Sequence, residues 1–344
     1  MRAVAHASHG GLEVLELVEL ADPSPAADEV VVAVRAAALN RLDVLQRAGP
    51  PLLPRFSLPH VAGMDLAGEV VAVGAAVGRQ LLGRRVLVKP GVHCRSCAAC
   101  LRGEDRLCTA MAVIGGSRPG GYAEYCAVPA SHVFPVPEQV SDEQAAVVPT
   151  AFSTAWRAVV LTGEVRPGEV MVVHGPGSGV THAAVQIARR AGARVVVTGR
   201  SPEKLARVAE LGAEAALSEE DPDEVEAAVR RLSAGRGADL VVNHVGPALF
   251  PLSLRLLRVD GRLAHCGTTT GASVRLELPF LYHNGLRLLG VGPQSHASFA
   301  AMLEHYWGAG YTAPIDSRFP LERAGEAQAR LESGEAFGKV LLVP

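Results

Sequence analysis

The segment VMVVHGPGSGV, residues 170–180, carries the clearest sign of how this chain folds. Its Val-rich beginning is typical of a buried strand, and the glycines that follow predict a tight turn. Beyond the turn, apolar residues recur at helical spacing from Val180 to Ala191, and Gly192 is placed to end that helix. The segment therefore predicts a strand, a glycine-rich turn and a helix in succession.

The same alternation continues to about residue 292. We expect further strands at residues 194–198, 240–243, 262–266 and 287–291, and helices at residues 202–211 and 250–257. Strands that alternate with helices form parallel βαβ units. This part of the chain therefore predicts an α/β fold with a doubly wound parallel sheet.

The first 150 residues have a different character. Short Val-rich runs at Glu29–Ala36, Gly68–Gly74 and Arg84–Lys89 are bounded by Gly, Pro and Asp, which is typical of strands and turns. Near the C-terminus we expect one more helix at residues 321–331 and a final strand at residues 339–343. A chain of 344 residues is long enough for about two domains.

The composition excludes several classes of protein. The 33 Lys+Arg residues nearly balance the 35 Asp+Glu residues without forming blocks, so we expect no nucleic acid and no membrane surface as partner. A hydrophobic content of 49% with a net charge of −2 excludes intrinsic disorder. No apolar stretch approaches the roughly 20 residues of a membrane-spanning helix, and residues 1–10 lack the apolar core of a secretory signal.

Four of the six cysteines lie close together in the sequence: Cys94, Cys97, Cys100 and Cys108. Four thiolates can close a tetrahedron around one structural Zn²⁺ and leave no position for a substrate. An iron–sulfur cluster and a pair of disulfides are the alternatives. Clustered thiols in a long chain indicate a reducing compartment, so we expect a cytoplasmic protein. Cys126 and Cys266 are expected to be buried apolar side chains.

The turn after residue 174 is a candidate phosphate-binding loop. At such a turn, backbone N–H groups and the positive end of a helix can approach a pyrophosphate closely. Gly175 matches the start of the G-x-G-x-x-G pattern, but its third glycine is absent. The strand before the turn and the helix after it favour a dinucleotide site over an ordinary tight turn. The predicted cofactor contacts in this loop are Gly177, Ser178, Gly179 and Val180.

The end of the second strand predicts which dinucleotide is bound. An Asp or Glu at that place normally holds the 2′-hydroxyl of NAD. This sequence has Gly199, Arg200 and Ser201 instead, followed by Lys204. These side chains attract a 2′-phosphate, whereas a carboxylate would repel one. We therefore expect NADP(H) as cofactor; the alternative is that Arg200 and Lys204 are solvated residues at a helix start.

Three segments together resemble the medium-chain dehydrogenase/reductase superfamily. Residues 91–108 resemble the structural-zinc lobe of its zinc alcohol dehydrogenases, and residues 58–70 resemble their Gly-His-Glu segment. Residues 120–125, Gly-Gly-Tyr-Ala-Glu-Tyr, resemble the turn that precedes a strand in the same family. The resemblance covers essentially the whole chain.

This resemblance implies how the chain is divided. A GroES-like catalytic domain at residues 1–151 and 293–344 would pack against a Rossmann dinucleotide-binding domain at residues 152–292, with the active site in the cleft between them. Such enzymes act on small-molecule substrates. They form homodimers or homotetramers, so we expect edge strands near residues 286–292 to pair between copies.

The departures from the zinc alcohol dehydrogenases are informative. In those enzymes two Cys and one His bind a catalytic zinc, and the matching positions here are Asn40, Met64 and Thr150, which are poor zinc ligands. The hydroxyl and imidazole that relay the alcohol proton fall at Leu42 and Leu45. Residues 39–49 are similar instead to the quinone oxidoreductase branch. That branch has no catalytic zinc and prefers NADPH, although it usually lacks the four-cysteine lobe.

The resemblance also implies catalytic roles. Asn40, beside Thr150, would hydrogen-bond the substrate or the nicotinamide ribose. Asp43 would order that loop, and Thr154 would buttress the nicotinamide. Plain alternatives exist, because Asn40 and Thr154 could be loop or cap residues and Asp43 a helix N-terminal charge.

Further cofactor contacts are implied farther along the chain. Gly246 and Gly267 end two strands, where bare backbone can reach the cofactor. Lys339 would approach the cofactor phosphates, the alternative being a surface lysine on the last strand. We expect four histidines to be packed and hydrogen-bonded rather than metal ligands: His60, His174, His244 and His265.

These features predict an NADPH-dependent oxidoreductase that reduces a quinone or an α,β-unsaturated carbonyl by hydride transfer without a catalytic zinc. Quinones and enones delocalise the developing negative charge onto oxygen themselves and can take their proton from water. Two alternatives remain. One is an alcohol dehydrogenase with an atypical site, with Asp65 or His60 recruited to a metal, and the other is a non-catalytic NADPH-binding protein.

Overall fold

The computed structural model describes residues 1–344, which form two compact units. The first unit comprises Met1–Thr150, Gln294–Ala309 and Ala313–Pro344, and the second comprises Ala151–Pro293 and Gly310–Thr312. Helix α4 (Pro149–Trp156) begins in the first unit and ends in the second. None of the helices is both long and apolar enough to cross a membrane.

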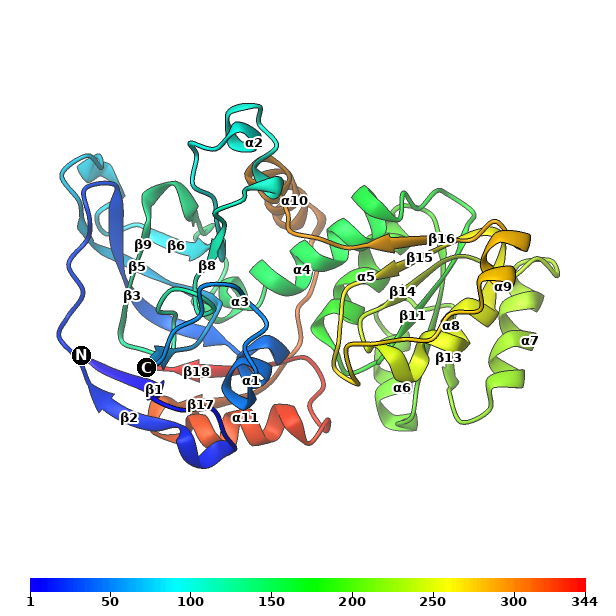
Figure 1. Cartoon of the computed structure of the whole chain (residues 1–344). Helices are drawn as coiled ribbons and strands as arrows, with labels where there is room; N and C mark the ends of the chain where they lie inside the picture. Colours follow the sequence, from blue (N-terminus) through cyan, green and yellow to red (C-terminus); the bar gives the residue numbers. More distant parts are fainter. The chain divides into compact units, whose positions relative to one another are not determined.

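The first unit is built on a sheet with the strand order β10-β6-β5-β3-β18-β17, and β9 also pairs with β3. The C-terminal strand β18 runs antiparallel to β3, with Leu341 opposite Ala38, so the last residues complete a sheet begun near the N-terminus (Figure 1). Two smaller sheets, β2-β1-β4 and β7-β8, accompany it. The strands of this unit are β1 (Arg2–His6), β2 (Glu16–Glu19), β3 (Glu29–Ala38), β4 (His60–Val61), β5 (Asp65–Val73), β6 (Arg85–Val88), β7 (Gly91–Val92), β8 (Ala112–Val113), β9 (Tyr125–Pro129), β10 (Val133–Pro135), β17 (Ile315–Pro320) and β18 (Lys339–Val343).

The helices of the first unit are short, apart from α10, and lie around these sheets. In α3 the Ser141 side chain accepts a hydrogen bond from the backbone N–H of Gln144 at 3.1 Å, which caps the helix. The helices are α1 (Arg41–Ala48), α2 (Ala98–Leu101), α3 (Asp142–Ala146), α10 (His296–Ala309) and α11 (Ala324–Glu332). The core of the unit gathers Val and Ala side chains of β3 and β5 with Leu342 of β18.

The second unit contains one six-stranded parallel sheet in the order β13-β12-β11-β14-β15-β16. This is the strand order of a Rossmann sheet, so the predicted α/β fold is confirmed. Its strands are β11 (Val170–His174), β12 (Arg194–Gly199), β13 (Ala215–Ser218), β14 (Ala238–Asn243), β15 (Leu257–His265) and β16 (Arg287–Gly290). Its helices after α4 are a π-helical turn (Arg157–Thr162), α5 (Gly179–Arg190), α6 (Pro202–Ala209), α7 (Pro222–Leu232), α8 (Phe250–Leu256) and α9 (Leu278–His283).

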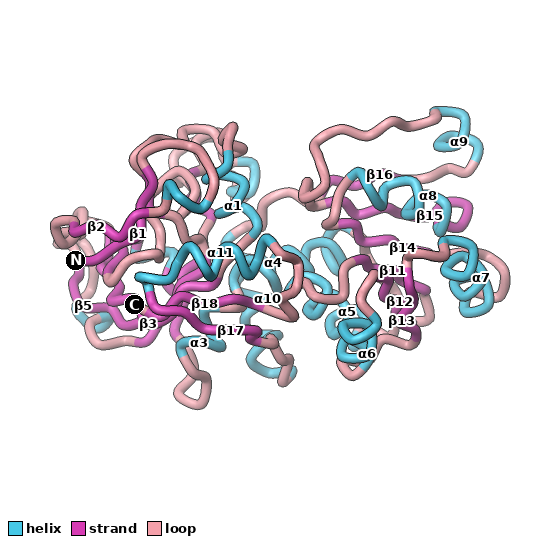
Figure 2. The backbone as a smooth tube through the Cα atoms, turned by 90° about the horizontal axis from the view of Figure 1, so that it is seen from below, coloured by secondary structure: helices cyan, strands magenta, loops and turns pink.

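The helices cover both faces of this sheet. The chain steps from β11 to β12 and β13 in one direction and then returns to β14, β15 and β16 in the other. Right-handed crossovers in opposite directions place their helices on opposite faces. Figure 2 accordingly draws α5 and α6 on one side of the strands and α7 on the other. The carboxyl ends of β11, β12 and β14 meet at one edge, where a ligand of a doubly wound sheet binds.

Several elements were not predicted from the sequence, among them β1, β2, β13, β17, α3, α7, α9 and α10. Helix α7 carries clear start signals, because the Asp221 side chain accepts from the N–H groups of Asp223 and Glu224 and Pro222 opens the helix.

The predicted domain limits at 151/152 and 292/293 each lie one residue from a limit of the observed units. The unexpected part is Gly310–Thr312, which belongs to the second unit, where Gln186 bonds the backbone N–H and C=O of Thr312 at 2.9 and 2.8 Å.

Candidate functional site

The glycine-rich turn connects β11 to α5 as the sequence predicts. Gly175 has a φ of +77°, a conformation that favours glycine. The Ser178 side chain accepts a hydrogen bond from the Val180 N–H at 3.2 Å and so caps α5. The predicted contacts Gly177, Ser178, Gly179 and Val180 therefore form the loop and first turn of a twelve-residue helix, where N–H groups suit an anion.

The end of β12 brings a cation and a carboxylate close together. Arg200 directly follows the strand and its side chain is exposed, while Ser201 caps α6 by accepting from the Lys204 N–H at 3.3 Å. A Cβ on Gly199 would lie 2.3 Å from Pro176 Cδ, so glycine is needed where the phosphate loop packs on the strand. No acid ends β12, but Glu219, just after β13, places Oε1 3.6 Å from Arg200 Nε. Sequence reasoning missed Glu219, because it depends on β13 pairing with β12.

Next to the loop, the last residue of β11 anchors a buried polar network. His174 Nδ1 lies 2.6 Å from Thr198 Oγ1, and its Nε2 lies 2.9 Å from Ser253 Oγ. The Ser253 hydroxyl donates its one proton to Leu249 O at 2.6 Å, because a carbonyl can only accept. His174 Nε2 and Asn243 Nδ2 therefore both donate to Ser253 Oγ. Burial lowers the pKa of His174 to about 3, so the imidazole is neutral and its Nδ1 accepts from the Thr198 hydroxyl.

A second histidine extends this network to the first turn of α5. Thr181 Oγ1 donates to His174 O at 2.8 Å and accepts from His244 Nε2 at 2.8 Å. Burial lowers the pKa of His244 to about 4, so this imidazole is neutral as well. The ends of β11, β12 and β14 and the start of α5 are therefore held in one array, which fixes the glycine-rich turn between β11 and α5. The third expected histidine, His60, bonds Gly115 O at 3.0 Å, and His265 packs beside Phe250.

Gly246 and Gly267 lie at the carboxyl ends of β14 and β15, as expected. Gly246 has a φ of +111°, and a Cβ on Gly267 would lie 1.8 Å from His244 O. Both positions thus require glycine for local reasons within the sheet. Their approach to the cofactor stays a prediction.

In the first unit, three side chains converge on one buried carboxylate. Asp65 Oδ1 accepts from the Thr150 N–H at 3.0 Å and from its hydroxyl at 2.6 Å. Asp65 Oδ2 accepts from Asn40 Nδ2 at 3.0 Å and from Lys339 Nζ at 3.2 Å, and the same ammonium donates to Asn40 Oδ1 at 2.7 Å. We call Asn40, Asp65, Thr150 and Lys339 the Asp65 cluster.

The Asp65 cluster unites three predicted site residues around Asp65, which the sequence offered only as a metal ligand in the alternative alcohol dehydrogenase. Lys339 is buried and bonded here, so it is no surface lysine. Its expected contact with the cofactor phosphates stays a prediction. The sequence signal for Asp65 was a carboxylate at the start of an apolar strand, directly after Met64. Thr154 is half-buried and lies four residues after Thr150 on α4.

Asp43 supports the loop that carries Asn40. Its Oδ2 accepts from the Asn40 N–H at 2.8 Å and from the Tyr122 hydroxyl at 3.0 Å. Complete burial raises the pKa of Asp43 to about 6, although both hydrogen bonds act in the opposite direction. The arrangement fits both the expected ordering of the loop and a charge at the start of α1.

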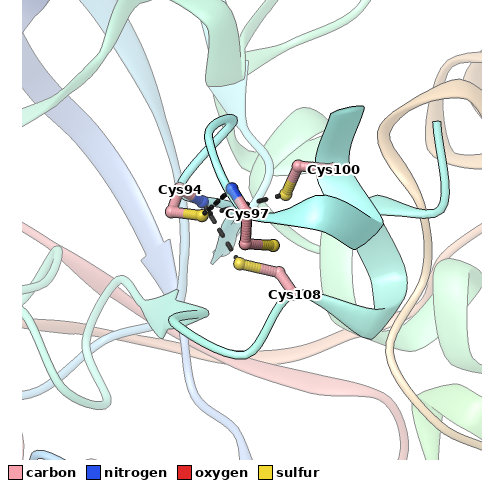
Figure 3. A group of neighbouring side chains, drawn as sticks. All are labelled: Cys94, Cys97, Cys100 and Cys108. Atoms are coloured by element: carbon pink, nitrogen blue, oxygen red, sulfur yellow. Dashed lines mark hydrogen bonds between the residues drawn. The ribbon is translucent and has the colours of Figure 1, made fainter. Parts of the chain in front are cut away.

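The sulfur atoms of the four clustered cysteines lie close together (Figure 3). Cys94 lies in the loop before α2, Cys97 directly precedes the helix, Cys100 belongs to it and Cys108 follows the next turn. All four Sγ atoms lie within 4.8 Å of one another, and Cys94 Sγ lies 4.0 Å from Cys100 Sγ. A tetrahedral zinc with Zn–S bonds of about 2.3 Å places its sulfurs about 3.8 Å apart. Backbone N–H groups of Cys97 and Cys94 donate to Cys94 Sγ and Cys108 Sγ, both at 3.3 Å, which stabilises thiolates. The geometry fits one zinc ion better than a larger iron–sulfur cluster, and no disulfide is formed.

The two other cysteines differ from these four. Cys126 is buried among the apolar side chains of the first unit, and burial raises its pKa to about 12. Cys266 is half-buried rather than fully buried, and burial likewise raises the pKa of its thiol to about 12. Neither thiol has the lowered pKa of a nucleophile, which agrees with the expected packing role.

Comparisons with known proteins agree with both units. Residues 26–138 match the family described as alcohol dehydrogenase GroES-like domain, and residues 179–307 match the zinc-binding dehydrogenase family. A solved NAD-dependent alcohol dehydrogenase is 39% identical with a TM-score of 0.94, over 100% of both chains. The human quinone oxidoreductase is 27% identical over 100% of this chain and 98% of its own length. The acryloyl-coenzyme A reductase of Metallosphaera sedula is also 27% identical, over 95% and 96%.

Proposed function

The chain belongs to the medium-chain dehydrogenase/reductase superfamily and is an oxidoreductase, and we propose that it transfers hydride from NADPH to a quinone or an α,β-unsaturated carbonyl without a catalytic metal. The observation that carries this proposal is the Asp65 cluster. Asn40 and Thr150 stand at positions that bind the catalytic zinc of the zinc alcohol dehydrogenases, and both are bonded to the Asp65 carboxylate together with an ammonium.

The donor chemistry of the Asp65 cluster does not suit a zinc ion. The Asp65 carboxylate already accepts four hydrogen bonds, which matches its four lone-pair sites. The Asn40 amide donates to Ala38 O and Asp65 and accepts from Lys339. A zinc ion in this place would have to displace the Lys339 ammonium from Asp65, and its other neighbours, Asn40 and Thr150, offer only neutral oxygens, which are weak zinc ligands. The cluster is therefore proposed to support a substrate that needs no Lewis acid.

NADPH fits the second unit. The α5 N-terminus and its capped turn suit the pyrophosphate, and exposed Arg200 suits the 2′-phosphate. When bound, NADPH supplies the hydride. The network of His174, Thr181 and His244 holds the loop in one conformation, so little conformational entropy is lost when NADPH binds. We propose the remaining contacts at Lys204, Gly246 and Gly267.

The side chains of the protein then act in the chemical step mainly by positioning the substrate. Lys339 retains one N–H beyond the bonds already described, whereas both N–H groups of the Asn40 amide are donated to Ala38 O and Asp65. We propose that the remaining Lys339 N–H donates to a substrate carbonyl oxygen, with Asp43 and Tyr122 keeping the Asn40 loop in place. A quinone or enone carries the developing negative charge on its own oxygen and takes its proton from water.

One structural zinc is proposed for the four cysteines. All four ligand positions would be thiolates, so the ion would have no open position for a substrate or water. Its contribution would be to fold the loop that carries α2.

A metal and substrate panel tests the proposal. We expect one zinc per chain and oxidation of NADPH by naphthoquinones or by an enone such as 2-cyclohexenone, with the activity retained after dialysis against a chelator. The Arg200→Gln variant should weaken the binding of NADPH and leave the binding of NADH unchanged. The matched control is Arg207→Gln, which removes an exposed arginine of the same helix region. Two zincs per chain with activity lost on chelation would contradict a metal-free mechanism.

A second candidate is alcohol oxidation with NAD, because the 39% identical structure is an NAD-dependent alcohol dehydrogenase. Oxidation of primary or secondary alcohols with NAD at a rate above NADPH-dependent quinone reduction would favour it. If neither reaction occurs and NADPH still binds, the non-catalytic alternative gains support.

We also propose a homodimer formed through β16. This strand ends the parallel sheet, and large apolar side chains are exposed on it and on α9: Leu278, Phe280, Tyr282 and Leu288. Light scattering of the intact chain tests this. Leu288→Lys should shift the mass toward the monomer, and an unchanged mass would contradict pairing through β16.

A further inference from the structure

A carboxylate lies beside the cation that is proposed to bind the 2′-phosphate. Glu219 follows β13, and its backbone N–H donates to Gly199 O at 3.0 Å, which continues the pairing of β13 with β12. Its Oε1 lies 3.6 Å from Arg200 Nε. Glu219 is thus fixed by sheet pairing at the place where a Rossmann sheet meets the adenosine ribose, although it comes from the neighbouring strand.

The two partners differ sharply in their surroundings. The Arg200 side chain is 83% exposed, whereas that of Glu219 is only 14% exposed. Glu219 Oε2 is buried and has no hydrogen-bond partner. Burial raises the pKa of this carboxyl and the nearby Arg200 lowers it. Arg200 is therefore the group that compensates the Glu219 charge, while most of its guanidinium remains open to solvent.

This arrangement has opposite consequences for the two nucleotides. A 2′-phosphate on Arg200 would bring a second anion to a guanidinium that already faces a carboxylate, and like charges at this distance repel. A 2′-hydroxyl would bring no charge and would leave the pair of Arg200 and Glu219 undisturbed. We propose that Glu219 limits the discrimination between NADPH and NADH by occupying Arg200, so that NADH remains acceptable. This inference rests on the proposed role of Arg200 in binding the 2′-phosphate.

The test is a titration of the zinc-loaded full chain with NADPH and NADH, followed by nucleotide fluorescence. Exposed ion pairs shift an equilibrium by roughly two- to fivefold. We expect Glu219→Gln to tighten NADPH by that factor and to leave NADH unchanged. Glu220→Gln is the matched control, because it removes the same charge from the next residue, which is exposed and makes no ion pair with Arg200.

A cycle with Arg200→Gln shows whether Glu219 acts through the guanidinium. In the Arg200→Gln background, Glu219→Gln should change the affinity for NADPH no more than Glu220→Gln does. An equal effect in both backgrounds would mean simple long-range repulsion and would overturn the inference. Weaker NADH binding by Glu219→Gln would also overturn it, because Glu219 would then be a ribose ligand.

Failure of the inference and failure of the proposed function give different results. If Arg200→Gln weakens NADPH but Glu219→Gln does not tighten it, only the inference is wrong. If Arg200→Gln leaves NADPH affinity unchanged, the phosphate-binding role itself is wrong, and the inference falls with it. A thermal unfolding midpoint within error of the parent protein confirms that each variant is folded.

Discussion

The ammonium of Lys339 lies 3.2 Å from the carboxylate of Asp65, and both side chains are almost completely buried. The two residues are 274 positions apart in the sequence, and the pairing depends on β18 adding to the sheet beside β3. Removing one member of a buried pair leaves an uncompensated charge. We therefore expect the loss of either partner alone to destabilise the first unit.

Lys339→Met should lower the free energy of unfolding by about 3–5 kcal/mol, because Asp65 would remain charged and buried. The double variant Asp65→Asn/Lys339→Met should recover part of that loss. Urea unfolding measures both. The control is Arg318→Gln, which breaks the exposed pair with Glu143 and should cost at most about 1 kcal/mol. A loss for Lys339→Met as small as that of the control would show that the buried pair does not stabilise the fold.

His174 predicts an acid-sensitive second unit. Its folded pKa of about 3 lies below the unfolded value of about 6.5, so the unfolded chain binds the extra proton between these values. The contribution of His174 to the free energy of unfolding is therefore fully present above pH 6.5. It falls by about 2 kcal/mol between pH 7 and pH 5. His174→Gln should therefore destabilise the protein more at pH 7 than at pH 5.

The matched control for this experiment is His283→Gln, which alters an exposed histidine of α9. It should change stability little at either pH. Equal losses for His174→Gln at pH 7 and pH 5, measured by urea unfolding, would contradict a neutral buried imidazole.

The cysteine loop predicts a metal that can be removed without loss of cofactor binding. Cys100→Ser should remove the bound zinc and lower the thermal midpoint, because three ligands no longer close the tetrahedron. NADPH affinity should stay unchanged, since the phosphate loop belongs to the second unit. Metal analysis and nucleotide titration measure the two effects.

Cys126→Ala serves as control for the zinc content, because this thiol lies outside the cluster. It should retain one zinc per chain. Full zinc content in Cys100→Ser, or loss of zinc in Cys126→Ala, would show that the ligand set is wrong.

Gly267→Ala should destabilise the second unit by at least about 2 kcal/mol, because the new Cβ would lie 1.8 Å from His244 O. The displaced strand end should also weaken NADPH binding through His244 and Thr181. Gly308→Ala is the control, since nothing lies within 4 Å of its Cβ and alanine favours a helix. A Gly267→Ala protein with the parent's unfolding midpoint would mean that the sheet yields easily at this point.

Local signals account for what was predictable. The strand, turn and helix at residues 170–190 follow from neighbouring residues alone, because hydrophobic period, glycine and cap all lie within one short segment. The cysteine cluster was predictable for the same reason. The start of helix α7 is encoded just as locally, because Asp221 caps the helix and Pro222 opens it, although this helix was not predicted.

The sequence by itself determined the alternation of strands and helices in the second unit, the glycine-rich turn after β11 and the clustering of four cysteines. Tertiary structure alone decided which groups meet at Asp65, because Asn40, Thr150 and Lys339 come from distant segments joined by the sheet. It also decided that Glu219 faces Arg200, since the order of β13 and β12 follows from crossover packing rather than from any neighbouring residue. Charge compensation between such partners depends on distance in space, and no spacing along the chain records it.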